Sequence, residues 1–173
     1  MIQPIALVGM MGSGKSTVGR RLATQLGVDF IDADRELEAR CGVPVATIFD
    51  LEGEAGFRRR ESDLLAELLA EPLMRVIATG GGVVLAPQNR EQLRKYSRVV
   101  YLEAQLQDLW NRLRHDRERP LLRTPNPRER IGEFLQLRHP LYAEVALLSV
   151  KTSRTGVDRV VNDIIEGLKL TSQ

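Results

Sequence analysis

The chain has 173 residues, of which 43% are hydrophobic and 28% charged, and its 25 basic and 23 acidic residues leave a net charge of +2. This composition is typical of a globular protein that is long enough to bury a core. A net charge so near zero argues against overall attraction to nucleic acid or to a membrane surface, and no run of 18 apolar residues suggests a membrane-spanning helix.

Cys41 is the only cysteine of the chain, so an internal disulfide is excluded and a reducing compartment is favoured. The N-terminal segment resembles a first strand rather than a secretion signal, because it lacks a charged lead and a long apolar stretch. We therefore expect a cytoplasmic protein that forms a single domain over residues 1–173 and acts as a monomer.

The most informative segment is residues 9–16, which read GMMGSGKS and match the phosphate-binding pattern G-x-x-x-x-G-K-[ST] completely. The apolar run Ile5–Val8 precedes it, as expected for a strand that is buried on both faces. After it, three apolar residues recur at the four-residue spacing of a helix: Val18, Leu22 and Leu26. Strand, glycine-rich loop and helix in this order favour a nucleoside triphosphate site over a chance turn.

Each part of this loop has its own task in binding phosphates. The glycines let the backbone turn tightly and direct several N–H groups at one anion, and the helix that follows adds the positive end of its dipole. Lys15 supplies a positive charge for the β- and γ-phosphates, and the Ser16 hydroxyl is spaced to ligate Mg²⁺. The predicted nucleotide-binding residues of this segment are Gly12, Ser13, Gly14, Lys15, Ser16 and Thr17.

Strand-like and helix-like segments then alternate along the chain. Short apolar runs predict further strands over residues 28–31, 74–78, 99–102 and 147–150. Helices are predicted over residues 34–40, 45–51, 54–70, 105–113, 128–146 and 157–168, with another after Pro87. The helix over 128–146 should bend or break at Pro140, which lacks a backbone donor. Five strands alternating with helices predict an α/β domain of three layers with a parallel sheet.

Two aspartates, Asp32 and Asp34, follow the second predicted strand. Ligands of open α/β sheets bind at the carboxyl ends of the strands. If the backbone stays extended, the two side chains share a face, which suits phosphoryl transfer: one carboxylate near Mg²⁺ and the other near the acceptor hydroxyl. The alternative is a structural role, in which Asp34 is the N-cap of the next helix.

Residues 80–82 are three consecutive glycines directly after the predicted strand 74–78. Because they have no Cβ, they would let a ligand approach main-chain N–H groups closely. The alternative is a plain turn between a strand and a helix, although such a turn rarely needs three glycines.

Two arginines are candidates for binding an anionic acceptor. Arg58 follows Phe57, which should face the core, so Arg58 should lie beside a pocket wall, and Glu61 three residues later would orient it. Arg138 is the second candidate, because arginine is suited to forked recognition of a carboxylate. The alternative for either residue is a solvated position.

Residues 113–127 are rich in arginine and proline, and Arg119 lies in this segment. A solvated loop and a nucleic-acid patch are alternatives, but aromatic side chains for base stacking are absent from the segment. A mobile lid that closes arginines over ATP fits better, since phosphoryl transfer needs positive charge at the γ-phosphate and exclusion of water.

In this order the motifs resemble those of the shikimate kinase family over nearly the whole chain. The matching segments are GMMGSGKS at 9–16, FIDAD at 30–34, GEAGFRRRE at 53–61, ATGGG at 78–82, RPLL at 119–122, and Arg138 with Tyr142. The resemblance implies ATP-dependent phosphorylation of the 3-hydroxyl of shikimate, in chorismate and aromatic amino-acid biosynthesis. It also implies a P-loop kinase fold like that of nucleoside monophosphate kinases, with helices on both faces of a five-stranded parallel sheet and a mobile lid over residues 113–127.

The resemblance also implies roles for individual residues. The shikimate-binding set would be Asp34, Arg58, Gly81 and Arg138. Ser16 and Asp32 resemble the magnesium site, and Lys15, Asp34 and Arg119 the catalytic set, with Arg119 reaching the phosphates. Arg112 would flank the adenine, and Arg154 lies in the adenine loop, which here reads KTSR at 151–154 where the family often has Asp-Thr.

Two other functions are compatible with parts of the sequence. One is another small-molecule or nucleotide kinase of the same fold, such as a gluconate or nucleoside monophosphate kinase. The other is a regulatory module that binds ATP without transferring its phosphate. The paired aspartates and the arginine-rich segment favour a kinase that transfers phosphate over a regulatory module. Nucleic acid is the least expected partner, because the net charge is near zero.

Overall fold

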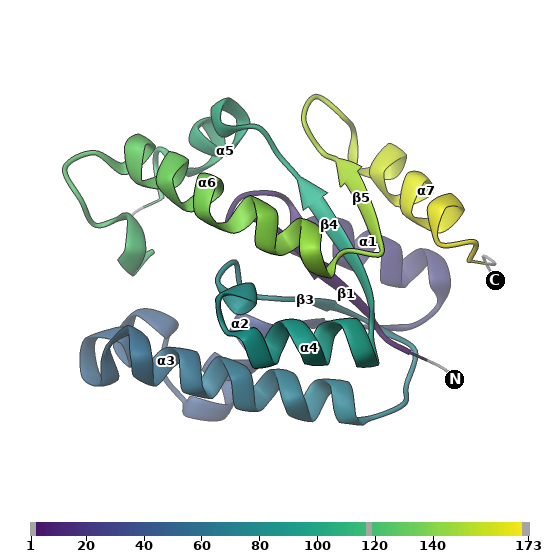
Figure 1. The fold of residues 1–173 in the computed structure, drawn as a ribbon, viewed down its shortest axis with the longest axis horizontal. Helices are drawn as coiled ribbons and strands as arrows, with labels where there is room; N and C mark the ends of the chain where they lie inside the picture. Colours follow the sequence, from purple (N-terminus) through teal and green to yellow (C-terminus); the bar gives the residue numbers. More distant parts are fainter. Residues whose placement is uncertain (1–2, 117–118, 171–173) are drawn as a thin grey trace.

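The computed structural model describes residues 3–116 and 119–170. In this part of the chain, five strands form one parallel sheet in the order β2-β3-β1-β4-β5 (Figure 1). The strands are β1 (Ile5–Val8), β2 (Asp29–Asp32), β3 (Arg75–Ala78), β4 (Arg98–Glu103) and β5 (Leu148–Lys151). All five predicted strands are confirmed, and their ends differ from the predicted ones by one residue at most.

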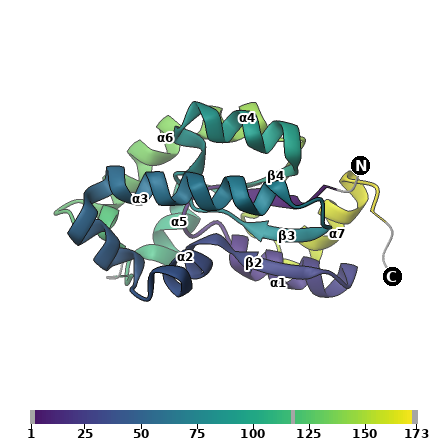
Figure 2. The same cartoon turned by 90° about the horizontal axis from the view of Figure 1, so that it is seen from below.

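Helices connect the strands and cover both faces of the sheet. They are α1 (Lys15–Leu26), α2 (Ala33–Cys41), α3 (Val45–Ala70), α4 (Pro87–Tyr96), α5 (Leu106–Leu113), α6 (Pro127–Val145) and α7 (Val157–Gly167). Figure 2 shows α3, α4 and α6 on one side of the sheet and α1 and α7 on the other. None of the described helices combines the length and the apolar character that are needed to cross a membrane.

The central strand β1 contributes to two separate cores. Ile5 and Leu7 pack with the apolar side chains of α1 and α7, whereas Ala6 and Val8 pack with those of α3, α4 and α6. All four side chains are fully buried. Because successive side chains of a strand point to opposite faces, a strand between two helix layers is apolar throughout.

Two predictions about helix continuity have different outcomes. The interruption between residues 51 and 54 is confirmed, because Gly53 has φ 70° and ψ 178°, which kinks α3. At Pro140 we predicted a bend or a break, and the break is wrong, since α6 continues through this residue to Val145. Pro140 and Gln136, whose carbonyl loses its helical partner, are both exposed, so water can replace the missing hydrogen bond.

The start of α2 overturns the alternative given for Asp34 and the expectation of an extended backbone between the two aspartates. Asp32 is the N-cap of this helix, and its Oδ1 accepts a hydrogen bond from the Arg35 N–H at 3.3 Å. Asp34 is therefore not the cap but lies in the first helical turn, and the backbone between the two residues is not extended. The cap falls on Asp32 because the strand ends there, two residues before Asp34.

Candidate active site

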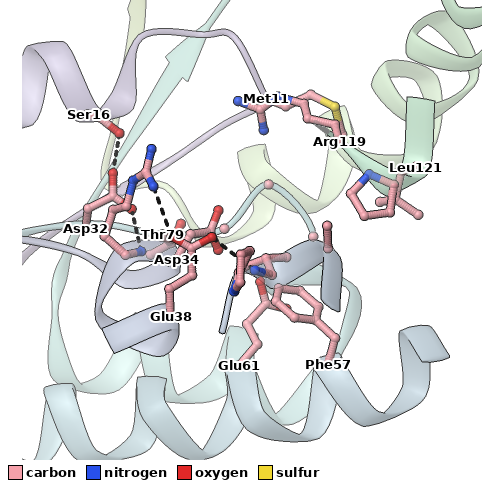
Figure 3. Close-up of a pocket in the computed structure, with 18 of the residues that line it drawn as sticks. Met11, Ser16, Asp32, Asp34, Glu38, Phe57, Glu61, Thr79, Arg119 and Leu121 are labelled. Carbon is pink, nitrogen blue, oxygen red and sulfur yellow. Dashed lines mark hydrogen bonds and ion pairs between the residues drawn. The ribbon is translucent and has the colours of Figure 1, made fainter. Parts of the chain in front are cut away.

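A cavity of about 1280 Å³ lies beyond the carboxyl ends of β1, β2 and β3. Its walls come from the phosphate loop, the start of α2, the kinked helix α3, residues 80–82 and the segment around Arg119. Figure 3 shows Ser16, Asp32 and Asp34 on one side of it, with Phe57 and Glu61 from α3 below and Arg119 above. The fold therefore brings together side chains that are distant in the sequence.

The phosphate loop ends at Gly14, which precedes α1 with φ 97°, a backbone conformation that favours glycine. The Lys15 Nζ donates hydrogen bonds to the Gly9 and Met10 carbonyls at 2.8 and 2.9 Å. Burial lowers the pKa of Lys15 to about 8, an effect that the negative charge of Asp34 opposes. This ammonium group is thus held inside the loop, at the place where the sequence pattern puts phosphates.

Ser16 and Asp32 form a contact that suits a metal. The Ser16 Oγ donates to Asp32 Oδ2 at 2.5 Å, so a hydroxyl and a carboxylate oxygen converge beside the loop (Figure 3). Mg²⁺ takes few protein oxygens and fills its remaining positions with water and phosphate oxygens. This donor pair therefore fits Mg²⁺, and its role as the metal site stays a prediction.

Asp34 lines the cavity between the phosphate loop and α3. Burial and the neighbouring charge of Asp32 raise the pKa of this carboxyl, while Lys15, Arg119 and Arg58 act in the opposite direction. A carboxylate with a raised pKa that faces three cations is well placed to accept a hydrogen bond from a hydroxyl group.

Arg58 is anchored by two carboxylates of its own helix. Its Nη1 donates to Glu61 Oε2 at 2.6 Å and its Nη2 to Glu54 Oε1 at 3.3 Å. Glu61 is only 6% exposed, and burial raises the pKa of its carboxyl, which the cation of Arg58 opposes. The Arg58 Nε and the Glu61 Oε1 are buried without a hydrogen-bond partner among the described residues, so both still have bonding capacity for a ligand.

The glycines at 80–82 let these side chains approach the loop after β3. A Cβ on Gly80 would lie 2.2 Å from Glu61 Oε1, and one on Gly82 would lie 2.3 Å from Arg58 Nη2. A Cβ on Gly81 would lie 3.2 Å from the Met11 nitrogen of the phosphate loop. The glycines therefore accommodate α3 and the phosphate loop, which a plain turn would not require.

Arg138 enters the cavity from α6 and is 1% exposed. Its guanidinium carbon lies 4.3 Å from the centroid of the Phe134 ring, which supports it from one side. Burial lowers the pKa of Arg138. Its Nε and Nη1 have no hydrogen-bond partner in the described part of the chain. A buried cation with free N–H groups is suited to an anionic ligand.

The predicted lid is described over residues 113–116 and 119–127, and residues 117 and 118 lie outside the described residues. The Arg119 Nε donates to Asp116 Oδ2 at 2.8 Å, and Arg119 lines the cavity. A short 3-10 helix, Pro120–Leu122, follows and places Leu121 against the same cavity (Figure 3). Arg123 is paired with Asp50 at 3.5 Å, so this segment also contacts α3.

Two predicted nucleotide contacts lie outside the cavity wall. Arg112 is exposed on α5, and its Nη1 donates to the Gly12 carbonyl at 2.8 Å, which places it on the outer side of the phosphate loop. Arg154 is exposed in the turn after β5, with φ 58°. The structure brings Arg112 to the loop but gives Arg154 no place in the cavity.

The cavity also has an apolar wall that our sequence analysis did not identify. Phe49 and Phe57 come from the two arms of the kinked helix, and their ring centroids lie 4.7 Å apart. Met11 and Leu121 line the same space. Their apolar character alone does not separate them from core residues, so the sequence held no local sign of this wall.

The fold and this site together define the class of the protein, which is that of the P-loop kinases. The features that define it are the parallel sheet, the phosphate loop after β1, the hydroxyl–carboxylate pair beside this loop and the adjoining cavity. A family model described as shikimate kinase matches residues 11–169. A shikimate kinase of Aromatoleum aromaticum is 52% identical over 165 residues, which are 95% of this chain and 94% of that protein. The chain belongs to the shikimate kinase family.

Two solved structures complete the comparison. The shikimate kinase of Acinetobacter baumannii in complex with shikimate superimposes with a TM-score of 0.94 at 40% identity, over 98% of this chain and 94% of that one. A gluconokinase of Sinorhizobium meliloti has a TM-score of 0.62 at 20% identity, over 97% of this chain and 92% of that one. The second likeness is one of fold alone.

Proposed function

We propose that this chain transfers the γ-phosphoryl group of ATP to the 3-hydroxyl of shikimate, giving shikimate 3-phosphate and ADP, in chorismate and aromatic amino-acid biosynthesis. The bond between the γ-phosphorus and the β,γ-bridging oxygen breaks, a bond to the acceptor oxygen forms, and the hydroxyl proton is released. The observation that carries this proposal is that Arg58 and Arg138 share one cavity with the phosphate loop and keep buried N–H groups without partners.

The acceptor half of the site consists of Arg58, Arg138, Asp34 and Gly81. The two arginines would bind the carboxylate of shikimate, because a buried cation with free N–H groups is stabilised by an anion. Asp34 would accept hydrogen bonds from hydroxyl groups of the ring, and the Gly81 N–H would contact the acceptor. The apolar wall would cover the hydrocarbon part of the ring.

The nucleotide half consists of the phosphate loop and cations around it. The predicted ligands are Gly12, Ser13, Gly14, Lys15, Ser16 and Thr17, with Arg119 reaching the phosphates and Arg112 and Arg154 beside the adenine. Support for Arg112 comes from its bond to the Gly12 carbonyl, and support for Arg119 from its place in the cavity. Residues 113–127 would act as a lid that excludes water during transfer.

Ser16 and Asp32 would hold Mg²⁺, which when bound supplies positive charge to the phosphate oxygens. Lys15 and Arg119 would add positive charge to the same phosphates. Asp34 would orient the acceptor hydroxyl and receive its proton. The transition state of phosphoryl transfer is loose, so orientation is the larger part of this task.

We further propose that the chain works as a monomer in the cytoplasm, with the lid and both halves of the site in the single domain 1–173. The free cysteine Cys41 and the use of ATP support the cytoplasmic location. Sedimentation velocity at micromolar concentration tests the monomer, and a dimer would contradict it.

The decisive experiment measures ADP formation from ATP and Mg²⁺ with and without shikimate. We expect turnover that depends on shikimate. Turnover with gluconate or a nucleoside monophosphate but not with shikimate would assign the chain to another kinase specificity. ATP binding without stimulation by any acceptor would favour a regulatory module.

A further inference from the structure

Three residues of helix α6 recur at the four-residue spacing of one helical face: Phe134, Arg138 and Tyr142. Arg138 lines the cavity, and the other two lie one turn before and one turn after it. All three are buried. Arg138 has a proposed role at the acceptor carboxylate, and Phe134 supports its guanidinium group. Tyr142, one turn further on, lies outside the predicted site residues, although its hydroxyl reaches the same region.

The Tyr142 hydroxyl joins α6 to the loop after β3. It donates a hydrogen bond to the Gly81 carbonyl and lies 3.8 Å from the Met10 sulfur of the phosphate loop. Tyr142 is fully buried, so a hydroxyl there needs a partner, and the Gly81 carbonyl is that partner. One side chain thus connects three elements that surround the cavity.

The ring of Tyr142 is held from behind by a second tyrosine. It stacks on Tyr101 of β4 with ring centroids 5.1 Å apart and 30° between the planes. The Tyr101 hydroxyl contacts His139 Nδ1 at 3.0 Å. The ring of Tyr142 is therefore packed against a strand of the sheet, which restricts where its hydroxyl can lie.

This connection matters because of where α6 is weakest. Pro140 lies between Arg138 and Tyr142 and removes one main-chain hydrogen bond of the helix. Without that bond, the helix by itself holds Arg138 less firmly. Arg138 Nη1 also lies close to Gly81, since a Cβ on this glycine would be 3.6 Å from it. The hydrogen bond from Tyr142 to Gly81 therefore lies beside both proposed acceptor contacts, Gly81 and Arg138.

We propose that Tyr142 is a positioning residue for the acceptor, because its hydroxyl fixes the Gly81 peptide relative to Arg138. Tyr142 does not itself contact the substrate. The inference rests on the proposed function, in which Gly81 and Arg138 bind shikimate.

The test compares two substitutions that each remove one hydroxyl from the stacked pair. For Tyr142→Phe we expect the KM for shikimate to rise about three- to tenfold, the range that corresponds to one hydrogen bond. The KM for ATP should stay within about twofold, because the only contact with a described residue that the phosphate loop loses is the one to the Met10 sulfur, a weak acceptor. For Tyr101→Phe, whose hydroxyl bonds to the exposed His139, we expect both KM values within about twofold of the wild type.

A double-mutant cycle separates positioning from a general structural role. In an Arg138→Lys background, Tyr142→Phe should raise the KM for shikimate less than it does in the wild type, because both changes act on one arrangement. Additive effects, or a Tyr142→Phe variant that affects the two substrates equally, would overturn the inference. If this variant melts below the assay temperature, calorimetric titration of shikimate in the cold replaces the kinetic measurement, and an unchanged Kd overturns the inference. A wild-type chain that does not use shikimate would instead refute the proposed function.

Discussion

The guanidinium group of Arg58 lies against the α-carbon of Gly82, so closely that a Cβ there would be 2.3 Å from Nη2. The loop after β3 therefore packs against Arg58 and limits where its guanidinium group can lie. The atom that would clash is the end of a flexible side chain, so a larger residue at position 82 would displace Arg58 rather than unfold the protein.

We expect Gly82→Ala to raise the KM for shikimate, with a loss of about 1–3 kcal/mol in acceptor binding from the overpacked contact. The KM for ATP should change little. Gly132→Ala is the matched control, because its Cβ would meet Leu106 at an ordinary 3.6 Å. Steady-state kinetics with thermal melting checks both variants, and an unchanged KM for shikimate in Gly82→Ala would contradict the prediction.

Removing Arg58 itself should have a larger effect. Arg58→Ala should raise the KM for shikimate by an amount that corresponds to about 2–5 kcal/mol, because it leaves the acceptor carboxylate and Glu61 without their cation. The adjacent Arg59 is exposed, so Arg59→Ala controls for the loss of charge on α3. Equal KM values for the two variants would show that Arg58 does not bind the acceptor.

Arg119 and Arg123 offer a comparison within the lid segment. Both arginines line the cavity, but Arg119 is partly buried and paired with Asp116, whereas Arg123 is exposed and paired with Asp50 of α3. We expect Arg119→Ala to lower kcat on the order of 10³-fold, as for other arginines that reach the transferred phosphate. Arg123→Ala should keep kcat within about threefold, since exposed ion pairs contribute little. A loss in Arg119→Ala that is confined to ATP affinity would make it a binding residue only.

Lys15 should impose an alkaline limit on nucleotide capture. Its pKa is lowered to about 8, mainly by burial, so the ammonium form that attracts phosphates is lost as the pH rises through this value. We expect kcat/KM for ATP to fall above that pH. The limit in kcat should lie at higher pH, because bound phosphates favour the charged amine. A kcat/KM profile that stays flat up to about pH 10, near the ordinary lysine pKa, would contradict this assignment.

Asp34 should determine the acid limb of the kcat/KM profile for shikimate. Burial and the charge of Asp32 raise its pKa, so the carboxylate is lost on acidification at a pH above the ordinary range near about 4. Asp34→Asn should remove this limb and lower kcat, whereas Asp63→Asn, at an exposed position of α3, should do neither. Retention of kcat in Asp34→Asn would exclude essential base catalysis.

The sequence by itself determined the features that depend on local chemistry. A glycine-rich loop between an apolar strand and a helix has one well-known geometry, so the phosphate site was predictable from residues 9–16 alone. Continuous apolar runs predicted the five buried strands, and the rule that ligands bind at their carboxyl ends pointed to residues 32–34 and 80–82. The kink at Gly53 was also predictable, since glycine interrupts a helical pattern.

Tertiary structure alone decided how those features meet. Whether Asp32 or Asp34 caps α2 depends on where β2 ends, which is set by pairing with β3. Whether α6 breaks at Pro140 depends on the exposure of the Gln136 carbonyl. Residues 80–82 are glycines because Glu61, the phosphate loop and Arg58 approach them in space. These outcomes come from contacts between residues that are distant in the chain, and the spacing of residue types along a sequence carries no record of such distances.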